Sequence, residues 1–599
     1  MLNSSVTRHA RTQHYLTGKW NDVATRVEKD GELILFISSK KDEHDSEKDQ
    51  STNVYHMIVP RSQHSESSSI LAKQKELEHF EDYEVYEVVD KPLNTKIIGT
   101  QWVLVDKDVP GSKERIRKAR LCMRGDQEIG TENVHTDAPT VNKINIKLML
   151  IEAVRKGWQI NTSDVTRAFL QTSEIDREVF VKPPIEAGLP ENKVWKLTRP
   201  AYGLIDAAHS FFLNFAENLI QLGCETCKMD NATFYHFSDS TKPGDDKREL
   251  DGIIGTHIDD ALEVGNEQMK EKVIENMKKR FTFGSQESLS FRYVGLNIEK
   301  EDEKVTINQD HFVDSIEIPD IGEISSLKKD VLLSEKFQTT FRSLVSKLNM
   351  LSMSARPDIS FEVKLLTMRY GKATKGDLSS AIKLLKKIKR VATKITIPDM
   401  GEIKDWIIVA YADAATKKVD NAYSVAGYVV FLVNEKNNYA VPLTWSSKKI
   451  ERVVTSSLGA EALAMVKVIG IVYFIKEILK QMYGVTAGDI PCLVLTDSKD
   501  LYESVHNIKN PQDKRLIGDI LQIKQAIAID NIITEVRHVS GSEMLADPLT
   551  KGGLNADELL NVIRCGVLKV PGDASVKSSM KINTSTWQKL MQAQSENFN

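Results

Sequence analysis

The chain contains few cysteines, five in 599 residues: Cys122, Cys224, Cys227, Cys492 and Cys565. Most of them lie far apart, so the sequence excludes a disulfide framework and fits a reducing compartment. Cys224 and Cys227 form one C-x-x-C pair, but a tetrahedral zinc site needs four ligands. A zinc knuckle would place its histidine at position 232, which is Ala232. We therefore interpret the pair as structural.

The sequence also lacks a strong charge imbalance. Its formal net charge is −4, so any surface that binds nucleic acid must be local. We find no apolar run that approaches the length needed to cross a bilayer, and the first residues, MLNSSVTRHARTQ, have no apolar signal core. We therefore expect no membrane partner. Apolar residues make up 41% and charged residues 27%, which is typical of a globular protein, and the length indicates several domains.

Internal repeats are absent, and the first 70 residues contain little that would form a core. Residues 40–49 are almost wholly charged, and residues 65–69 (SESSS) are rich in serine. Such segments cannot bury enough apolar surface to fold alone. We expect a partly disordered N-terminal segment with one short strand near residues 31–39.

Paired carboxylates stand in residues 252–264, GIIGTHIDDALEV. Two apolar arms flank Asp259 and Asp260, a pattern that predicts a strand, a tight turn and a returning strand. Asp is common in turns for local reasons, so the pair alone is weak evidence. Asp164 ends a predicted strand at residues 158–165, and enough chain follows for both strands to join one sheet. Three carboxylates at one sheet edge could hold two Mg²⁺ ions.

A second acidic set follows in the C-terminal half. Asp413 ends a predicted strand, Glu461 begins a long helix, Asp497 ends a later strand and Asp547 opens the last helix. Acids near helix starts often serve only as caps. Four acids in this order of strands and helices, however, favour one cation-binding site, because four like charges repel without cations. His538, at a strand end, could aid proton transfer or product release, although a structural role is the common one.

Two basic segments could contact phosphates. Residues 113–124, KERIRKARLCMR, carry six positive charges and one Glu, and residues 383–394, KLLKKIKRVATK, carry six positive charges and no acid. At helical spacing the second segment predicts a basic stripe beside an apolar one. A solvated face is the alternative in both cases.

From about residue 73 to 552, these motifs and their order resemble the polymerase end of a copia-type LTR retrotransposon polyprotein. The matching blocks of the first half are residues 101–103, 118–121, 163–165 with 168–170, 202–204, 257–260, 293–296, 341–345 and 356–359. Those of the second half are residues 411–413, 460–462, 497–498 and 546–551. The resemblance rests on the whole ordered set.

The resemblance implies an α+β and α/β multidomain fold. It would contain a right-hand polymerase fingers–palm domain at 71–315, a helical thumb or connection region at 316–400, and an RNase H-like domain with a mixed sheet at 401–555. Residues 1–70 and 556–599 would be terminal segments. The implied activity is that of an RNA-directed DNA polymerase (a nucleotidyltransferase) with ribonuclease H (endonuclease) activity, which copies retrotransposon RNA into DNA before integration.

The resemblance also implies site residues and partners. The metal ligands would be Asp164, Asp259 and Asp260 for the polymerase, and Asp413, Glu461, Asp497 and Asp547 for the nuclease, with His538 as a further catalytic residue. Phe169 would exclude a ribose 2′-OH, the group that distinguishes RNA from DNA building blocks. Lys118 and Arg120 would hold the triphosphate. Two Mg²⁺ or Mn²⁺ ions would serve each site. The expected partners are an RNA template, a DNA primer, the RNA–DNA hybrid, dNTPs, and capsid and integrase parts, in a cytoplasmic virus-like particle or the nucleus.

Departures from the family pattern keep other functions open. His257 replaces a tyrosine, Ile205 replaces a lysine, Asp206 replaces a glutamine beside the incoming nucleotide, and Asp126 replaces a phenylalanine. A carboxylate near a triphosphate would add repulsion. The alternatives are a polymerase-dead remnant that still cuts hybrids, and a non-catalytic nucleic-acid-binding protein of transposon origin. Because no Asp-Ser/Thr-Gly protease motif or His-His-Cys-Cys module is present, we expect a fragment of a longer polyprotein or a truncated gene.

Overall fold

The computed structural model describes residues 10–14, 19–29, 32–37, 57–59, 61–108, 115–240, 245, 248–417, 423–484, 489–507 and 513–574. The predicted strand near residue 31 is β3 (Glu32–Ile37), which pairs with β2 (Lys19–Lys29), and β2 pairs with β1 (Ala10–His14). The charged run 40–49 lies outside the described residues. The serine-rich run does not stay unstructured, because Ser67 begins α1 (Ser67–Asp82) and the buried Ser69 hydroxyl donates to the Gln63 carbonyl.

Two small sheets and α1 form the fingers. β4 (Met57–Ile58), β7 (Thr100–Asp108) and β8 (Arg115–Met123) make an antiparallel sheet. β5 (Tyr86–Asp90), β11 (Lys193–Leu197), β10 (Phe180–Val181) and β6 (Ile97–Ile98) make the other. Gly99 thus divides β6 from β7, which follow each other in the chain but belong to two different sheets. Phe80, Leu121 and Trp195 are buried in the shared core of the fingers.

A six-stranded antiparallel sheet forms the palm. Its strand order is β12 (Glu225–Cys227), β13 (Asp230–Phe237), β14 (Leu250–His257), β15 (Asp260–Gly265), β9 (Gln159–Val165) and β16 (Phe283–Ser288). Successive side chains of a strand point to opposite faces. Ile253 accordingly joins the core that includes α2 (Lys143–Lys156), and Ile254 joins the core that includes α3 (Ala207–Gln221) and α5 (Glu275–Arg280).

A second antiparallel sheet and a group of helices follow the palm. The sheet order is β17 (Ser290–Tyr293), β18 (Leu296–Glu301), β19 (Lys304–Asn308) and β20 (Ile395–Ile397). Between β19 and β20 the chain forms α6 (Asp310–Ser315), α7 (Glu335–Ser352), α8 (Ser360–Thr367) and α9 (Lys375–Ile388), which share one apolar core. The helical region expected at 316–400 is thus present, but its last residues belong to a sheet strand.

The C-terminal sheet has the order β23 (Ala440–Lys449), β22 (Tyr423–Asn434), β21 (Trp406–Lys417), β24 (Cys492–Thr496) and β25 (Glu535–His538). The first three strands pair antiparallel, and β24 pairs parallel with both β21 and β25. α10 (Ser457–Tyr483), α11 (Lys499–His506) and α12 (Lys514–Ala528) complete the unit. α13 (Asp557–Cys565) contacts β20 and β23, so the segment after 555 continues the fold.

One expectation about apolar runs was wrong. α10 is long and apolar enough to pass a length and composition test for a membrane span, with a mean hydropathy of 1.9 over its best window. The prediction missed it because glycine and charged residues interrupt the run. α10 packs on β21 and β22 on one side and meets α12 on another, so its apolar surface is accounted for by the core of the C-terminal unit.

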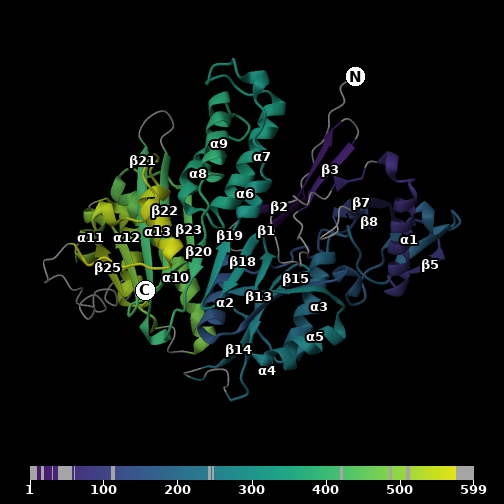
Figure 1. The fold of residues 1–599 in the computed structure, drawn as a ribbon, viewed down its shortest axis with the longest axis horizontal. Helices are drawn as coiled ribbons and strands as arrows, with labels where there is room; N and C mark the ends of the chain where they lie inside the picture. Colours follow the sequence, from purple (N-terminus) through teal and green to yellow (C-terminus); the bar gives the residue numbers. More distant parts are fainter. Residues whose placement is uncertain are drawn as a thin grey trace.

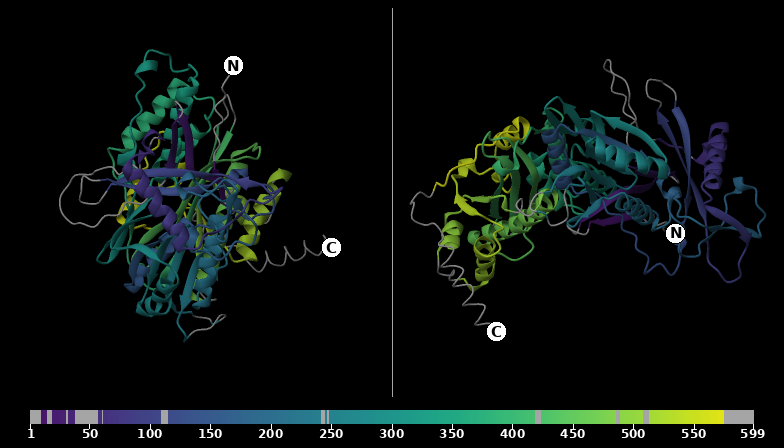
Figure 2. Two further views of the ribbon diagram at one scale, coloured as in Figure 1. Left: turned by 90° about the vertical axis from the view of Figure 1, so that its right-hand side faces the viewer. Right: turned by 90° about the horizontal axis from the view of Figure 1, so that it is seen from below.

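The fingers and the C-terminal unit lie at opposite ends of the molecule, with the palm between them (Figures 1 and 2). Helices α7, α8 and α9 rise together from the middle (Figure 1). The palm and the C-terminal unit share one continuous core, in which α2 packs against β23. Lys147 on α2 is buried there, and its ammonium donates to the Leu443 carbonyl at 2.9 Å.

Candidate active sites

The palm hairpin brings the first acidic set together. β14 ends at His257 and β15 begins at Asp260, so Ile258 and Asp259 form a two-residue turn. Ile258 has a φ of +59°, which is unfavourable for a β-branched residue and is the kind of backbone feature that concentrates at functional sites. In the sheet register, Asp260 lies opposite Asp164. The predicted hairpin and its placement beside Asp164 are therefore confirmed.

Asp164, Asp259 and Asp260 each offer a carboxylate oxygen, and these oxygens lie within 4.8 Å of one another. All three residues are partly exposed. Oxygen donors of this kind suit Mg²⁺, which binds through one or two carboxylates plus substrate phosphates and keeps several waters. Like charges this close favour a bound cation. These three carboxylates therefore suit a divalent metal ion whose remaining coordination positions are available to a substrate.

An aromatic pair and a cation lie near this acidic set. Phe169 lies in the 3₁₀ turn Ala168–Gln171 that follows β9, and its ring is 5.3 Å from that of Tyr202. The Arg120 guanidinium lies 5.6 Å from the Tyr202 ring. Lys118 and Arg120 are both exposed, two residues apart on β8, and so share one face of the strand. Tyr202 therefore links Phe169 to Arg120, whereas Lys118 has no described contact with them.

Gly203 fixes the segment that carries Tyr202 against the fingers. The Met123 amide donates to the Tyr202 carbonyl at 2.6 Å. Gly203 has a φ of +90°, and a Cβ there would lie 2.2 Å from the Met123 carbonyl oxygen. Only glycine allows this approach of two backbones.

Asp206, expected beside the nucleotide, is instead paired inside the protein. It precedes α3, is 6% exposed and receives two hydrogen bonds from the Arg177 guanidinium, one of them to Oδ1 at 3.0 Å. Arg177 also donates to Glu128 at 2.7 Å. Arg177, which Asp206 shares with Glu128, offsets part of the negative charge of Asp206 and so reduces the expected repulsion of a triphosphate. Asp126 is likewise paired, with Arg124 at 2.8 Å.

The second acidic set converges at one edge of the C-terminal sheet. Oxygens of Asp413, Asp497 and Asp547 lie within 4.8 Å of one another. Asp497 directly follows β24, as predicted. Asp413 does not end its strand, because β21 continues to Lys417 by pairing with β22. Asp547 opens a 3₁₀ turn, Asp547–Leu549, and not an α-helix.

Glu461 lies beside this cluster but outside the group of three. It is 7% exposed on the first turns of α10, and its Oε2 has no hydrogen-bond partner among the described residues. Burial, together with the charges of Asp413 and Asp497, raises its pKa to about 9. Burial also raises the pKa of Asp413 to about 6, against the opposing effect of Lys551. An unpartnered buried oxygen beside three carboxylates fits a site that takes a divalent cation.

Two residues that the sequence analysis missed contact this cluster. The Thr550 hydroxyl donates to Asp413, and the Lys551 ammonium lies 2.5 Å from Asp547 Oδ1 and 3.4 Å from Asp413 Oδ2. Both residues belong to the matched block 546–551. Lys551 follows Asp547 by four residues, a spacing that pairs side chains along a helix. That spacing could have indicated the pair, but not the contact with Asp413.

His538 lies at the end of β25, next to the second cluster. Its Nε2 is 3.2 Å from the Asp497 backbone oxygen, and its ring is 6.0 Å from that of Tyr502. The contact is with the main chain of a cluster residue. A part in proton transfer stays a prediction.

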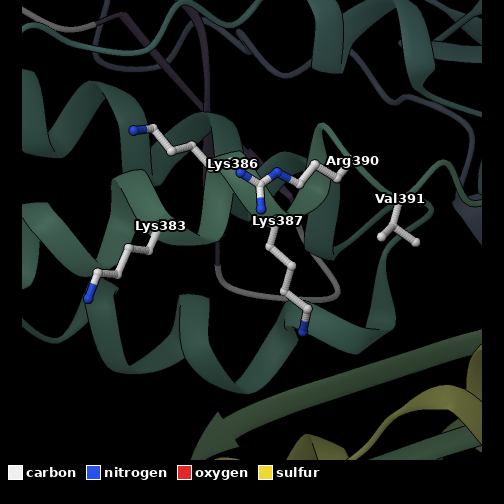
Figure 3. Close-up of a pocket in the computed structure, with 5 residues that line it drawn as sticks. All are labelled: Lys383, Lys386, Lys387, Arg390 and Val391. Atoms are coloured by element: carbon white, nitrogen blue, oxygen red, sulfur yellow. The ribbon is translucent and has the colours of Figure 1, made fainter.

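The two basic segments differ in how many of their positive side chains form ion pairs with nearby acidic side chains. In the first, Arg117 pairs with Asp106 and Glu66, and Arg124 pairs with Asp126. In the second, five cations of α9 and the turn after it are exposed, and one of them, Lys389, donates to the Val313 carbonyl. The other four are Lys383, Lys386, Lys387 and Arg390. Together with Val391 they line a surface pocket, and Figure 3 shows their side chains extending from the helix. We call these four residues the basic face of α9.

Comparisons with known proteins found a matching family model and several relatives. Residues 83–323 match the family model described as reverse transcriptase (RNA-dependent DNA polymerase). The chain is 25% identical over 497 residues to the retrovirus-related Pol polyprotein from transposon RE1 of Arabidopsis thaliana, covering 80% of this chain and 32% of that protein. It is 23% identical over 517 residues to the Pol polyprotein from transposon TNT 1-94 of Nicotiana tabacum, covering 82% of this chain and 37% of that protein. The chain thus spans about a third of the length of these relatives.

Many solved structures also align with this chain, and two of them illustrate the match. A foamy viral protease–reverse transcriptase in complex with an RNA/DNA hybrid aligns with 96% of this chain and 74% of its own, at 11% identity and a TM-score of 0.40. An RNase H1 isolated from compost, LC11-RNase H1, aligns with 26% of this chain and 96% of its own, at 19% identity and a TM-score of 0.18.

Proposed function

We infer that this chain, a relative of the copia-type retrotransposon Pol polyproteins with a reverse transcriptase domain, is an RNA-directed DNA polymerase that also degrades the RNA strand of its product. The observation that carries the proposal is the pair of acidic clusters, one at the palm hairpin and one at the edge of the C-terminal sheet. Each cluster combines three carboxylates from separate strands or turns, which local turn chemistry does not explain.

Asp164, Asp259 and Asp260 would hold the cations at the palm, and Asp413, Asp497 and Asp547, with Glu461 alongside, would hold them at the second site. Two divalent cations, when bound, supply an activated oxygen nucleophile and stabilise the leaving oxygen of a phosphoryl transfer. The protein's own contribution is to fix the carboxylates on paired strands, where the sheet register sets their separation.

Residues around the palm cluster are suited to binding a deoxynucleoside triphosphate. Arg120 offers a guanidinium to phosphate oxygens, and charge-assisted Arg–phosphate contacts are strong. Lys118 adds a second exposed cation on the same strand face. Phe169, packed on Tyr202, presents an aromatic edge five residues after Asp164, where it would exclude a 2′-hydroxyl.

The basic face of α9 is suited to the backbone of a duplex. Its four exposed cations, on α9 and the turn after it, would neutralise phosphates without reading sequence. We propose that it holds the RNA template and DNA primer, and then the RNA–DNA hybrid. Capsid and integrase parts of a longer polyprotein are proposed as further partners.

A polymerase-dead remnant remains the second candidate. Asp206 and His257 favoured it, but the pairing of Asp206 with Arg177 reduces the repulsion of a triphosphate on which half of that argument rested. His257 is partly exposed at the end of β14, next to the acidic turn. The third candidate, a binding protein without catalysis, draws on the basic face of α9 alone.

Primer extension on an RNA template tests the polymerase. Wild-type protein with Mg²⁺ should extend a DNA primer, and Asp260→Asn should lower the rate by at least about a thousandfold, since metal-ligating charge is lost. Asp302→Asn, at an exposed turn, is the matched control and should retain the wild-type rate. A wild-type protein that extends nothing would refute the polymerase.

Cleavage of a labelled RNA–DNA hybrid tests the nuclease in the same preparation. Asp497→Asn should abolish cleavage and leave primer extension intact, while Asp260→Asn should do the reverse. Cleavage without extension would select the remnant. Salt-sensitive hybrid binding with neither activity would select the binding protein.

A further inference from the structure

The second acidic cluster already contains a cation that belongs to the chain. The Lys551 ammonium lies 2.5 Å from Asp547 Oδ1, 3.4 Å from Asp413 Oδ2 and 4.0 Å from Asp497 Oδ2. One ammonium therefore lies within ion-pair distance of all three carboxylates whose oxygens converge.

The charge balance explains why a lysine lies there. Asp413 is 1% exposed and shares the site with two further carboxylates and the buried Glu461. Buried like charges are costly without a nearby positive charge. Lysine is suited to this position because its ammonium is a compact charge on a flexible stem.

Lys551 also has room to withdraw. Its side chain is 38% exposed, so one side of it faces solvent. Gly552 and Gly553 follow, and a Cβ at Gly553 would meet nothing within 4 Å. The preceding residue is fixed, because the Thr550 hydroxyl bonds to Asp413 and its amide to the Asp547 carbonyl. A change of side-chain rotamer could therefore move the ammonium while the main chain stays in place.

We propose that Lys551 is the resident counter-cation of the nuclease-like site and that it competes with divalent cations for the same carboxylates. In the metal-free protein the ammonium offsets one of the negative charges of the acidic cluster. A divalent cation enters only as the ammonium leaves, so Lys551 sets the metal affinity of the site. Lys551 is a positioning residue. The proposal rests on the proposed nuclease function only in so far as the bound metal is used for cleavage of the hybrid.

Calorimetric titration with Mn²⁺ tests the competition. The full chain is used with Asp259→Asn and Asp260→Asn, so that the palm cluster does not contribute. In this background Lys551→Met should bind Mn²⁺ about tenfold more tightly than Lys551, because a competing charge is gone. Lys551→Arg, which keeps the charge, should stay within about threefold. Lys436→Met, at an exposed turn of the same unit, should change nothing. Unchanged or weaker binding in Lys551→Met would overturn the proposal.

Thermal unfolding gives a second readout that does not depend on metal. In EDTA, Lys551→Met should have a lower Tm than Lys551→Arg, because the acids lose their counter-cation. With saturating Mn²⁺, Lys551→Met should instead have the higher Tm of the two variants. Equal Tm values in EDTA would contradict the proposal.

Amine acylation of the unmutated chain tests the displacement directly. Acetylation of Lys551, followed by mass spectrometry, should be slow without metal and several-fold faster with Mn²⁺, while Lys436 reacts equally in both. An acetylation rate of Lys551 that does not change on addition of Mn²⁺ would overturn the proposal. Hybrid cleavage is measured separately, so a protein that binds Mn²⁺ as described and cuts nothing would refute the nuclease and leave the competition standing.

Discussion

The role of Asp206 could not be predicted from its own position, because its ion-pair partner is distant in sequence. It stands where the family has a glutamine, and the substitution suggested an eroded nucleotide pocket. Arg177, 29 residues earlier, donates two hydrogen bonds to it and also contacts Glu128. The carboxylate is therefore part of a small, largely buried ion network at the start of α3.

Restoring the family residue should consequently weaken the protein. Asp206→Gln replaces two charge-assisted hydrogen bonds from the partly buried Arg177 with at best a neutral one, so the free energy of unfolding should fall by about 1–3 kcal/mol. Urea denaturation measures the change. Asp126→Asn, which breaks the exposed pair with Arg124, is the control and should cost less than about 1 kcal/mol. A more stable Asp206→Gln protein would contradict the structural role of the pair.

Glu461 and Asp413 predict how the metal-free protein responds to pH. Their pKa values are raised in the folded state, to about 9 and about 6, chiefly by burial. A raised carboxyl pKa means that the folded state binds more protons than the unfolded state. The associated stability is fully present below the unfolded pKa, near 4, and is lost as pH rises through the folded values.

Thermal unfolding in EDTA should therefore show a Tm that falls between about pH 4 and pH 9. Glu461→Gln should flatten this slope and raise the free energy of unfolding at pH 8 by roughly 2 kcal/mol, because no buried charge must form. Mg²⁺ should restore the wild-type Tm at high pH, since metal binding requires deprotonated carboxylates. A Tm that rises with pH in EDTA would contradict these assignments.

At the scale of elements, the sequence predicted the features that depend on the local pattern of residues. Two short apolar, β-prone arms flank Asp259 and Asp260 in β14 and β15, so the hairpin and its tip could be identified without tertiary information. The order of strands and helices in the C-terminal unit was visible for the same reason, and the strand order of its mixed sheet confirms the expected fold class.

Features that depend on tertiary pairing could not be predicted. β21 extends past Asp413 because β22 pairs with it as far as Lys417. The segment 97–105 divides at Gly99 because its two parts join different sheets. Lys551 reaches Asp413 only because a turn folds back onto the sheet, across a separation of 138 residues. Periodicity contains no signal for these contacts.

Gly203 predicts the behaviour of the segment that joins the fingers to the palm. Its φ is +90°, and the Met123 carbonyl oxygen lies 2.2 Å from the position that a Cβ would take. Gly203→Ala should therefore lower the free energy of unfolding by more than about 2 kcal/mol. Gly470→Ala on α10, where a Cβ meets nothing within 4 Å, should instead stabilise by about 0.5–1 kcal/mol. Denaturant titration measures both changes, and equal effects would contradict the close approach.

At the scale of the whole molecule, the palm and the C-terminal unit are joined by packing as well as by the chain. The Lys147 ammonium of α2 lies 4.3 Å from the Trp445 ring of β23, and the Trp445 indole also donates to the Ser352 carbonyl of α7, in the helical group, at 2.7 Å. Because one core includes both units, the two acidic clusters are held in a fixed relation.

Differential scanning calorimetry should therefore record one cooperative transition for the palm and the C-terminal unit. Trp445→Ala should lower the Tm of this transition and divide it into two transitions, because the shared core loses a large buried side chain. Trp102→Ala, in the fingers, should not separate them. Two independent transitions in the wild-type protein would show that the units fold apart.

The central claim is that two clusters of carboxylates on this chain are metal-binding active sites. Anomalous diffraction from crystals grown with Mn²⁺ and an RNA–DNA hybrid tests it most directly. The account predicts anomalous peaks among Asp164, Asp259 and Asp260 and among Asp413, Asp497 and Asp547, with Lys551 turned away from the second. Well-ordered crystals without a peak at either cluster would contradict it.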